Sequence, residues 1–217
     1  MKKSTKINIA VTTSVVLIFG VVAFFLVAKP FAPPREEIAA QTPVVEENTH
    51  RLDEAADGKV TIVEFLDFEC EVCGAVYPAI EQLREEYAGE VTFAFRYFPI
   101  PSHKNSMNAA LAVEAASQQG KLEEMYERLF VTQAEWGEQQ DSKAELFRNY
   151  ASELGLDLAQ FDAAIASPAT QARVKADFDA GRALGVDGTP TFFVNGKAVE
   201  VSSIDDIREA LDAALLQ

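Results

Sequence analysis

The sequence is short of basic residues, histidine and cysteine, and each shortage excludes a kind of site. Lysine and arginine number 19 against 34 acidic residues, which gives a formal net charge of -15. That charge argues against nucleic acid as a partner, and against binding to anionic lipid headgroups through a basic patch. Two histidines and two cysteines are present, and no internal repeat is visible. A hydrophobic content of 48% over 217 residues is enough for one domain of moderate size with an appendage.

One long uncharged segment lies near the N-terminus. Residues 7–28 read INIAVTTSVVLIFGVVAFFLVA, which is long enough to cross the hydrocarbon core of a bilayer as a helix. Lys2, Lys3 and Lys6 precede it without an acidic residue, so the positive-inside bias places this end in the cytoplasm. We therefore expect residues 1–28 to form a cytoplasmic basic tip and a single-pass transmembrane anchor, with everything that follows on the extracytoplasmic side of the cell membrane.

A cleavable signal peptide is the alternative for this segment, because it has a similar charged start and apolar stretch. The apolar run exceeds a typical signal core of about 7 to 15 residues, and no clean Ala-x-Ala site follows it, which favours an uncleaved anchor. The absence of a cysteine near its end argues against a lipoprotein. Both alternatives export the rest of the chain.

The composition changes after the hydrophobic segment. Residues 29–52 are acidic and rich in proline, and they lack apolar periodicity. This pattern predicts an extended tether that holds a domain clear of the membrane. Val44 and Val45 could add an edge strand at its end. The four prolines are Pro30, Pro33, Pro34 and Pro43.

The remaining residues, 53–217, show the pattern of one mixed domain. Residues 60–66 and 91–98 are β-rich runs that are apolar on both faces, as expected for strands buried inside a sheet. A helix pattern separates them, and the stretch from about 104 to 184 carries signals for several helices. We expect an α/β fold with a mixed β-sheet flanked by helices and an all-helical insertion after the second core strand.

Local signals mark where individual elements begin and end. Gly120 separates two helices of the insertion, Ser142 with Glu145 is typical of a capping box, and Ser167-Pro168 supplies a cap and a first-turn proline. Asn195-Gly196 favours a two-residue turn between two short antiparallel strands. Ser203 is then expected to cap a final helix.

The two cysteines, Cys70 and Cys73, follow the first predicted strand. A structural disulfide is one use of paired cysteines in an exported protein, but a bridge over two intervening residues closes a tiny loop and stabilises little. Zinc sites use the same spacing, yet they need further ligands. His50 in the tether and His103 in a loop do not supply such a set, so we expect no metal.

Redox chemistry fits the spacing of the cysteines better. Cys70 stands at the predicted start of a helix, where unpaired backbone N–H groups and the positive end of the helix dipole favour a thiolate. Cys73 lies about one turn further on the same face and can attack a mixed disulfide formed by Cys70. We predict Cys70 as nucleophile and Cys73 as resolving cysteine, with their redox-active disulfide in place of a cofactor.

Two segments carry a family resemblance. They are residues 65–78, FLDFECEVCGAVYP, and residues 185–196, GVDGTPTFFVNG. Together with the order of elements, they resemble the DsbA family of thioredoxin-fold oxidoreductases over about residues 59–217. The resemblance implies a thioredoxin-like fold and a protein disulfide oxidoreductase.

The resemblance also assigns roles to other positions. Thr189-Pro190 resembles the cis-proline loop that faces the cysteines, which implies that the Thr189 backbone is free to pair with an extended substrate strand. A trans proline that opens a strand is the alternative. Glu64 matches the family's buried acid, which implies a raised pKa and proton transfer to or from Cys73. The alternative for Glu64 is a side chain whose carboxyl group reaches solvent. Pro78 resembles the proline that kinks the active-site helix.

The dipeptide between the cysteines departs from the family pattern. Glu71-Val72 stands where a His-containing pair would help to hold the thiolate, and the carboxylates of Glu69 and Glu71 are expected to oppose it. They would soften the oxidising power, so the direction of electron flow stays open. Trp136, His103 and the aromatic residues of 93–98 are assigned to packing and not to chemistry.

These residues predict an extracytoplasmic thiol-disulfide oxidoreductase. Among such enzymes they favour a dithiol oxidase. It would introduce disulfides into exported proteins through a mixed disulfide on Cys70, and a membrane protein would reoxidise it. By resemblance, that partner is quinone-linked and of the DsbB or vitamin K epoxide reductase type. A disulfide reductase or isomerase of the cell envelope would use the same residues. A non-catalytic exported binding module, with permanently bonded cysteines, is the lesser alternative.

Overall fold

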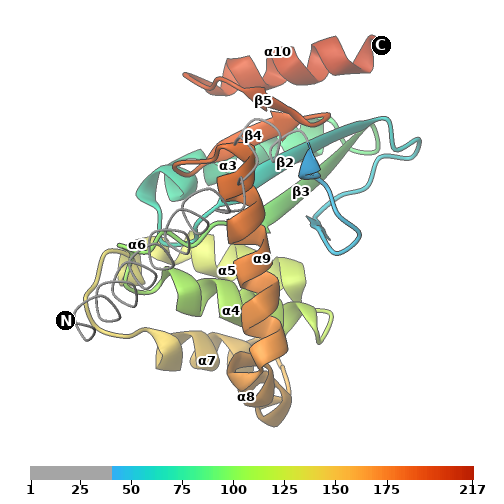
Figure 1. Ribbon diagram of the computed structural model, residues 1–217. Helices are drawn as coiled ribbons and strands as arrows, with labels where there is room; N and C mark the ends of the chain where they lie inside the picture. The colour runs from blue at the N-terminus through green and yellow to red at the C-terminus, as the bar shows by residue number, and fades with distance from the viewer. Residues whose placement is uncertain (1–40) are drawn as a thin grey trace, which may run out of the picture. The chain divides into compact units, whose positions relative to one another are not determined.

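The computed structural model describes residues 41–217, which form a five-stranded sheet with helices on both faces (Figure 1). The strands are β1 (His50–Arg51), β2 (Val60–Leu66), β3 (Val91–Tyr97), β4 (Thr191–Val194) and β5 (Lys197–Val199). The helices are α3 (Glu71–Glu86), α4 (Ser106–Ser117), α5 (Leu122–Val131), α6 (Gln133–Trp136), α7 (Ala144–Glu153), α8 (Leu158–Ala166), α9 (Pro168–Leu184) and α10 (Ile204–Leu215). Helices α4 to α9 follow one another between β3 and β4, and we call them the helical block.

The parallel strands β2 and β3 lie inside the sheet, whose strand order is β1-β3-β2-β4-β5. Their register runs from Val60 opposite Val91 to Leu66 opposite Tyr97, and α3 connects them. The other three pairings are antiparallel. A parallel pair needs such a crossover, and side chains that are apolar on both faces suit strands covered on both sides. The predicted mixed α/β sheet with a helical insertion after the second core strand is confirmed.

Successive side chains of β2 and β3 point to opposite faces of the sheet. On one face, Ile62 and Phe93 pack in a cluster to which α3 and α10 contribute. On the other face, Phe65 and Ala94 pack in a cluster bordered by Phe178 of α9. Figure 1 shows α10 beside β4 and β5, with α7 and α8 at the opposite end of these residues. The sheet thus separates two helical layers.

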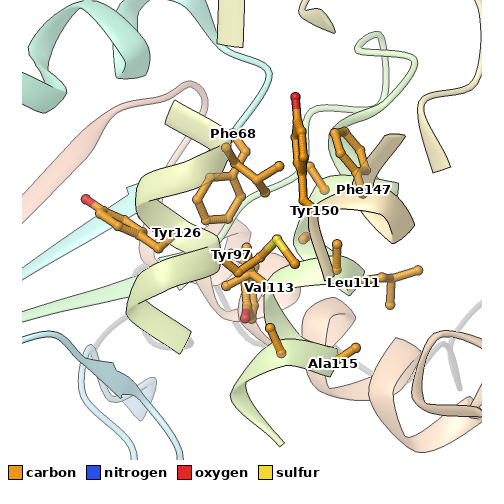
Figure 2. Close-up of a cluster of buried hydrophobic side chains, with 14 of the residues drawn as sticks. Phe68, Tyr97, Leu111, Val113, Ala115, Tyr126, Phe147 and Tyr150 are labelled. Atoms are coloured by element: carbon orange, nitrogen blue, oxygen red, sulfur yellow. The ribbon is translucent and has the colours of Figure 1, made fainter. Parts of the chain in front are cut away.

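An aromatic core joins the helical block to the ends of β2 and β3. The Phe68 ring centroid lies 5.8 Å from that of Tyr126 and 5.0 Å from that of Phe130, both on α5. Figure 2 shows Phe68 and Tyr97 among side chains from α4, α5 and α7. Cys70 and Cys73 belong to the same buried cluster. The helical block therefore forms one wall around the cysteines.

Most of the predicted element boundaries are confirmed. The first strand covers residues 60–66 as predicted, and the second ends at Tyr97, one residue earlier than predicted. Ser167 accepts a hydrogen bond from the Ala169 N–H, and Pro168 occupies the first turn of α9. Ser203 forms a capping box with Asp206 at the start of α10.

The predicted capping box at Ser142 and Glu145 is wrong. The N-cap of α7 is Lys143, whose own side chain makes no capping bond, and Ser142 Oγ accepts a hydrogen bond from the Ala144 N–H at 3.4 Å in place of the Glu145 N–H that a capping box requires. The Asn105 side chain accepts a hydrogen bond from the Lys143 N–H at 2.8 Å and donates to the carbonyls of Gln139 and Asp141. The hydrogen bonds of Asn105, a residue distant in the sequence, therefore hold the segment that leads into α7, and the predicted local capping box is absent.

The predicted tether over residues 29–52 extends too far. Its last part belongs to the domain, because β1 pairs with β3 and Val44 is buried in the core. Arg96, which is 1% exposed, donates hydrogen bonds to the carbonyls of Pro43 and Val44. A buried guanidinium needs hydrogen-bond acceptors, so these bonds hold Pro43 and Val44 against the domain. The edge strand is accordingly His50–Arg51 and not Val44 with Val45.

The predicted anchor, residues 1–28, lies outside the described residues, as does the part of the tether before residue 41. Among residues 41–217, no helix is both long enough and apolar enough to cross a bilayer.

Asp177→Ala should destabilise the domain strongly. Asp177 is 0% exposed, and its Oδ1 atom lies 2.7 Å from Nε of Arg96. Its removal takes away the fully buried counter-ion of Arg96 and leaves Glu46, 2.8 Å from Nη2, as the remaining carboxylate. Breaking a buried pair costs ~3–5 kcal/mol, and we expect a loss close to the lower end of that range. Urea unfolding measures this loss. Asp179→Ala is the matched control on the same helix, because it removes an exposed pair with Lys175, worth ~0.2–1 kcal/mol. Equal losses for both variants would contradict the assignment.

Candidate active site

The cysteines lie where β2 passes into α3. Cys70 is the N-cap residue of α3, with extended backbone angles of φ -69 and ψ 121, and its carbonyl accepts a hydrogen bond from the Gly74 N–H at 3.0 Å. Cys73 lies in the first turn of the helix. Both are free cysteines, and they are 5% and 1% exposed, respectively. The structure thus has the dithiol form, with one sulfur at the helix N-terminus and the other behind it.

The environment of Cys70 stabilises its thiolate. A hydrogen bond from the Cys73 side chain has the largest effect and lowers the pKa of Cys70 to about 5, against the opposing effect of burial. The Thr189 side chain and the backbone N–H groups of Cys73 and Val72 also contribute to this low pKa. Neither Glu69 nor Glu71 is among these leading influences, so their expected opposition does not prevent a low pKa.

Cys73 has the opposite environment. Burial, together with the hydrogen bond to Cys70 and the charge of Glu64, raises the pKa of Cys73 well above its ordinary value. One sulfur is therefore anionic near neutral pH and the other holds its proton. This asymmetry is what a nucleophile and a resolving cysteine require.

The Thr189-Pro190 loop faces Cys70 across the site. The peptide bond between these two residues is cis, as the resemblance implies. The protonated Cys70 Sγ donates a hydrogen bond to the Thr189 carbonyl at 3.3 Å. Thr189 Oγ1 is buried, and the Thr189 side chain favours the Cys70 thiolate. A loop more than a hundred residues away in the sequence thus contributes polar backbone and side-chain groups beside the sulfur.

Glu64 is buried on β2, on the side of the sheet that α3 covers. Burial is the main cause that raises its pKa to about 8, followed by the negative charges of Cys70 and Glu81. The alternative of a solvated Glu64 head is therefore wrong. A carboxyl that keeps its proton near neutral pH can donate it inside the protein. Its charge also raises the pKa of Cys73, so the two groups are electrostatically linked.

Asp67 and Glu69 are two further buried acidic residues beside the site, of which only Glu69 was singled out from the sequence. The Asp67 carboxylate accepts hydrogen bonds from the Glu69 and Ile100 N–H groups and lies 2.7 Å from Nδ1 of His103. Burial raises its pKa to about 6. The Glu69 carboxylate accepts a hydrogen bond from the Asn105 N–H at 2.5 Å. These contacts fix the turn before Cys70, and the alternation of acidic and apolar residues in LDFEC is the sequence signal for them.

The histidines lie in separate places. His50 Nε2 lies 2.8 Å from the carboxylate of Glu114 on α4, whereas the cysteines lie at the start of α3. His103 lies beside Asp67. Among residues 41–217, no three His, Cys, Asp or Glu side chains are grouped in a way that could hold a metal ion. The aromatic residues assigned to packing, Trp136 and Phe93 among them, are buried in the core.

The family model described as "Thioredoxin" matches residues 48–213, so the chain belongs to the thioredoxin family. Curated relatives include the Na(+)/H(+) antiporter NhaA 1 of Mycobacterium sp. strain KMS, which is 34% identical over 194 residues, 84% of this chain and 30% of that protein. NhaA 3 of Salinispora tropica is 39% identical over 142 residues, 65% of this chain and 21% of that protein. The chain thus spans about 30% or less of the length of these relatives.

Solved structures with the same fold include oxidised BdbD from Bacillus subtilis, with a TM-score of 0.66, 23% identity and coverage of 76% of this chain and 92% of that one. A thioredoxin-like oxidoreductase from Silicibacter pomeroyi DSS-3 has a TM-score of 0.66, 25% identity and coverage of 85% and 99%. Wolbachia pipientis alpha-DsbA1 has a TM-score of 0.68, 17% identity and coverage of 82% and 96%. Family, fold and dithiol together agree with the predicted enzyme class, a thiol-disulfide oxidoreductase.

The thiolate of Cys70 should titrate with a midpoint of about 5, because its folded pKa is depressed to that value. Ultraviolet thiolate absorbance of the reduced protein measures it, and Cys70→Ser should remove the step. By linkage, this group stabilises the reduced fold fully above the ordinary thiol pKa of about 8.5, and the contribution is lost as pH falls to about 5. A midpoint at the ordinary value would refute the assignment.

Glu64→Gln should flatten the dependence of stability on pH in the oxidised protein, in which neither cysteine titrates. The unfolded chain loses the Glu64 proton near pH 4.3, about its ordinary pKa, whereas burial, the largest cause of the raised pKa of Glu64, keeps the proton on the folded protein to higher pH even without the Cys70 charge. Wild-type protein therefore loses up to a few kcal/mol as pH rises through this window, and glutamine does not titrate.

Urea unfolding at both ends of the window measures the effect. Glu85→Gln, on the exposed side of α3, is the matched control and should keep the wild-type slope. If Glu64→Gln also keeps that slope, the buried carboxyl does not hold its proton as described.

Proposed function

We propose that the chain is an extracytoplasmic dithiol oxidase that introduces disulfides into exported proteins. The observation that carries this proposal is the depressed pKa of Cys70, about 5, beside a cysteine whose pKa is raised. Interactions that favour the Cys70 thiolate exist only in the reduced protein, so they stabilise the dithiol relative to the disulfide. A disulfide whose reduced form is stabilised is a stronger oxidant.

The first chemical step forms a mixed disulfide. A thiolate of the reduced client protein attacks Cys70 Sγ, the bond between Cys70 and Cys73 breaks, and Cys73 leaves as a thiolate that takes a proton. In the second step, another client thiolate attacks the client sulfur of the mixed disulfide, and Cys70 leaves as a stable thiolate. The client loses two electrons and the Cys70–Cys73 pair gains them, so no further cofactor is needed.

Glu64 supplies the proton to Cys73 in this scheme. Its neutral carboxyl near pH 7 follows from a pKa of about 8, and Cys73 has a pKa well above that. The proton therefore moves to the more basic sulfur as the disulfide breaks. In the reverse direction, the Glu64 carboxylate accepts the proton when Cys73 is reoxidised.

Thr189 and Pro190 hold the client in this proposal. An extended segment of the client pairs with the backbone of Thr189, as strands pair at a sheet edge, and this pairing brings its cysteine against Cys70. The support is the position of the Thr189 carbonyl, 3.3 Å from Cys70 Sγ.

The partners and the location belong to the same proposal. Residues 1–28 would anchor the enzyme in the cell membrane, with the cytoplasmic end bearing the three lysines and the catalytic domain outside. Exported proteins with reduced cysteines are the clients. A quinone-linked membrane protein of the DsbB or vitamin K epoxide reductase type would reoxidise the dithiol, and an anchored enzyme would meet it by diffusion in the membrane plane.

A turnover assay with a reduced, unfolded client tests the oxidase directly. The oxidised domain should form client disulfides, and Cys70→Ser should abolish the reaction. Cys73→Ser, given a disulfide-bonded client, should trap a mixed disulfide, because its Cys70 thiolate attacks the client disulfide and the resolving sulfur is missing. Gel shifts with and without reductant detect that species. A Cys70→Ser variant with wild-type activity would contradict the mechanism. A wild-type protein that only reduces client disulfides would show that electrons flow from the enzyme to the client, opposite to the proposal.

A further inference from the structure

Gln133 connects the helical block to the turn that carries Cys70. It is the first residue of the short helix α6, Gln133–Trp136. Trp136 at the other end of this helix is fully buried, donates its indole N–H to the Leu129 carbonyl at 3.2 Å, and packs edge-on against Phe147 with centroids 4.9 Å apart. The side chain of Gln133 therefore projects from an element that is fixed in the core.

The Gln133 carboxamide hydrogen-bonds to both ends of the turn before α3. Its Nε2 atom lies 2.8 Å from the Phe68 carbonyl oxygen and 2.8 Å from the Cys70 carbonyl oxygen. An amide nitrogen has two hydrogens, so it can donate one to each acceptor at the same time. The two carbonyls belong to the residue that enters the aromatic core and to the nucleophile itself. One side chain thus adds to the Gly74 N–H bond at the Cys70 carbonyl and ties the peptide that carries the sulfur to the Phe68 peptide.

Gly74 provides independent support for this contact. A Cβ atom at this position would lie 1.9 Å from Oε1 of Gln133 and 2.6 Å from its Cδ. Gly74 lies inside α3 and is not among the glycines with positive φ, so the backbone conformation does not require glycine here. The space does, because any side chain would displace the carboxamide from the turn.

We infer that Gln133 is a positioning residue for Cys70: by holding the Phe68 and Cys70 carbonyls, it keeps the sulfur against the first N–H groups of α3 and against Thr189. The inference rests on the proposed role of Cys70 as nucleophile. The bonds to Val72 and Cys73 that stabilise the thiolate depend on the rotation of the Cys70 peptide, which no side-chain cap fixes. Gln133 supplies that restraint from outside the helix.

The test compares Gln133→Met with Gln139→Met. Methionine keeps the length of glutamine but cannot donate, and Gln139 is an exposed residue of the same segment whose amide donates to the Glu135 carbonyl at 2.6 Å. The measurement is the pH profile of Cys70 alkylation by iodoacetamide in the reduced proteins. We expect the midpoint to rise by about one pH unit in Gln133→Met and to stay unchanged in Gln139→Met.

A purely structural role would lower the melting temperature without moving this midpoint, so melting is measured beside it. If Gln133→Met does not fold, Gln133→Ala removes the same bonds without filling the space and is tested in its place. A wild-type midpoint in the folded variant overturns the inference and leaves the proposed function intact. An ordinary midpoint in the wild-type protein overturns both.

Discussion

The hydrogen bonds that reach the Cys70 sulfur from the start of α3 are the interaction on which the account depends. The Cys73 thiol, the Thr189 side chain and the N–H groups of Val72 and Cys73 all favour the anion, and together they outweigh the burial that opposes it. Each of these groups is effective only if the sulfur stays at the helix N-terminus. The rest of the fold can be understood as the means of keeping it there, from β2 below the turn to the helical block beside it.

Three separate parts of the chain converge on this point. Strand β2 delivers the turn and places Glu64 beneath it, the Thr189-Pro190 loop closes the opposite side, and the helical block covers the sulfurs with the aromatic core around Phe68. Burial raises the pKa of all three groups, but its outcome differs between groups only a few residues apart. It keeps Glu64 and Cys73 protonated, while hydrogen bonds keep Cys70 ionised. The site therefore holds one charge where thiol-disulfide exchange needs it and protons where the leaving sulfur needs them.

Local sequence was enough to predict the elements that local forces determine. The apolar run of residues 60–66 defined a buried strand, Asn195-Gly196 marked a hairpin turn, and Ser203 marked a capped helix, since each signal lies within a few residues of its effect. The edge strand was predicted at Val44 and Val45 and the start of α7 at a capping box on Ser142, both misplaced, and the contact of Gln133 was not predicted. Each depends on residues far apart in the sequence, such as Arg96 with Pro43 or Asn105 with Lys143. Their side chains carry no local signal for such partners.

The equilibrium constant of the Cys70–Cys73 pair with glutathione tests the central claim most directly, because it compares the dithiol with the disulfide in one number. A protein that stabilises the Cys70 thiolate as described should have a standard potential clearly above that of thioredoxin, about -270 mV, and displaced toward that of DsbA, about -120 mV. A potential at or below about -270 mV would mean that the reduced form gains nothing from the helix N-terminus. That result would contradict the account and favour a reductase.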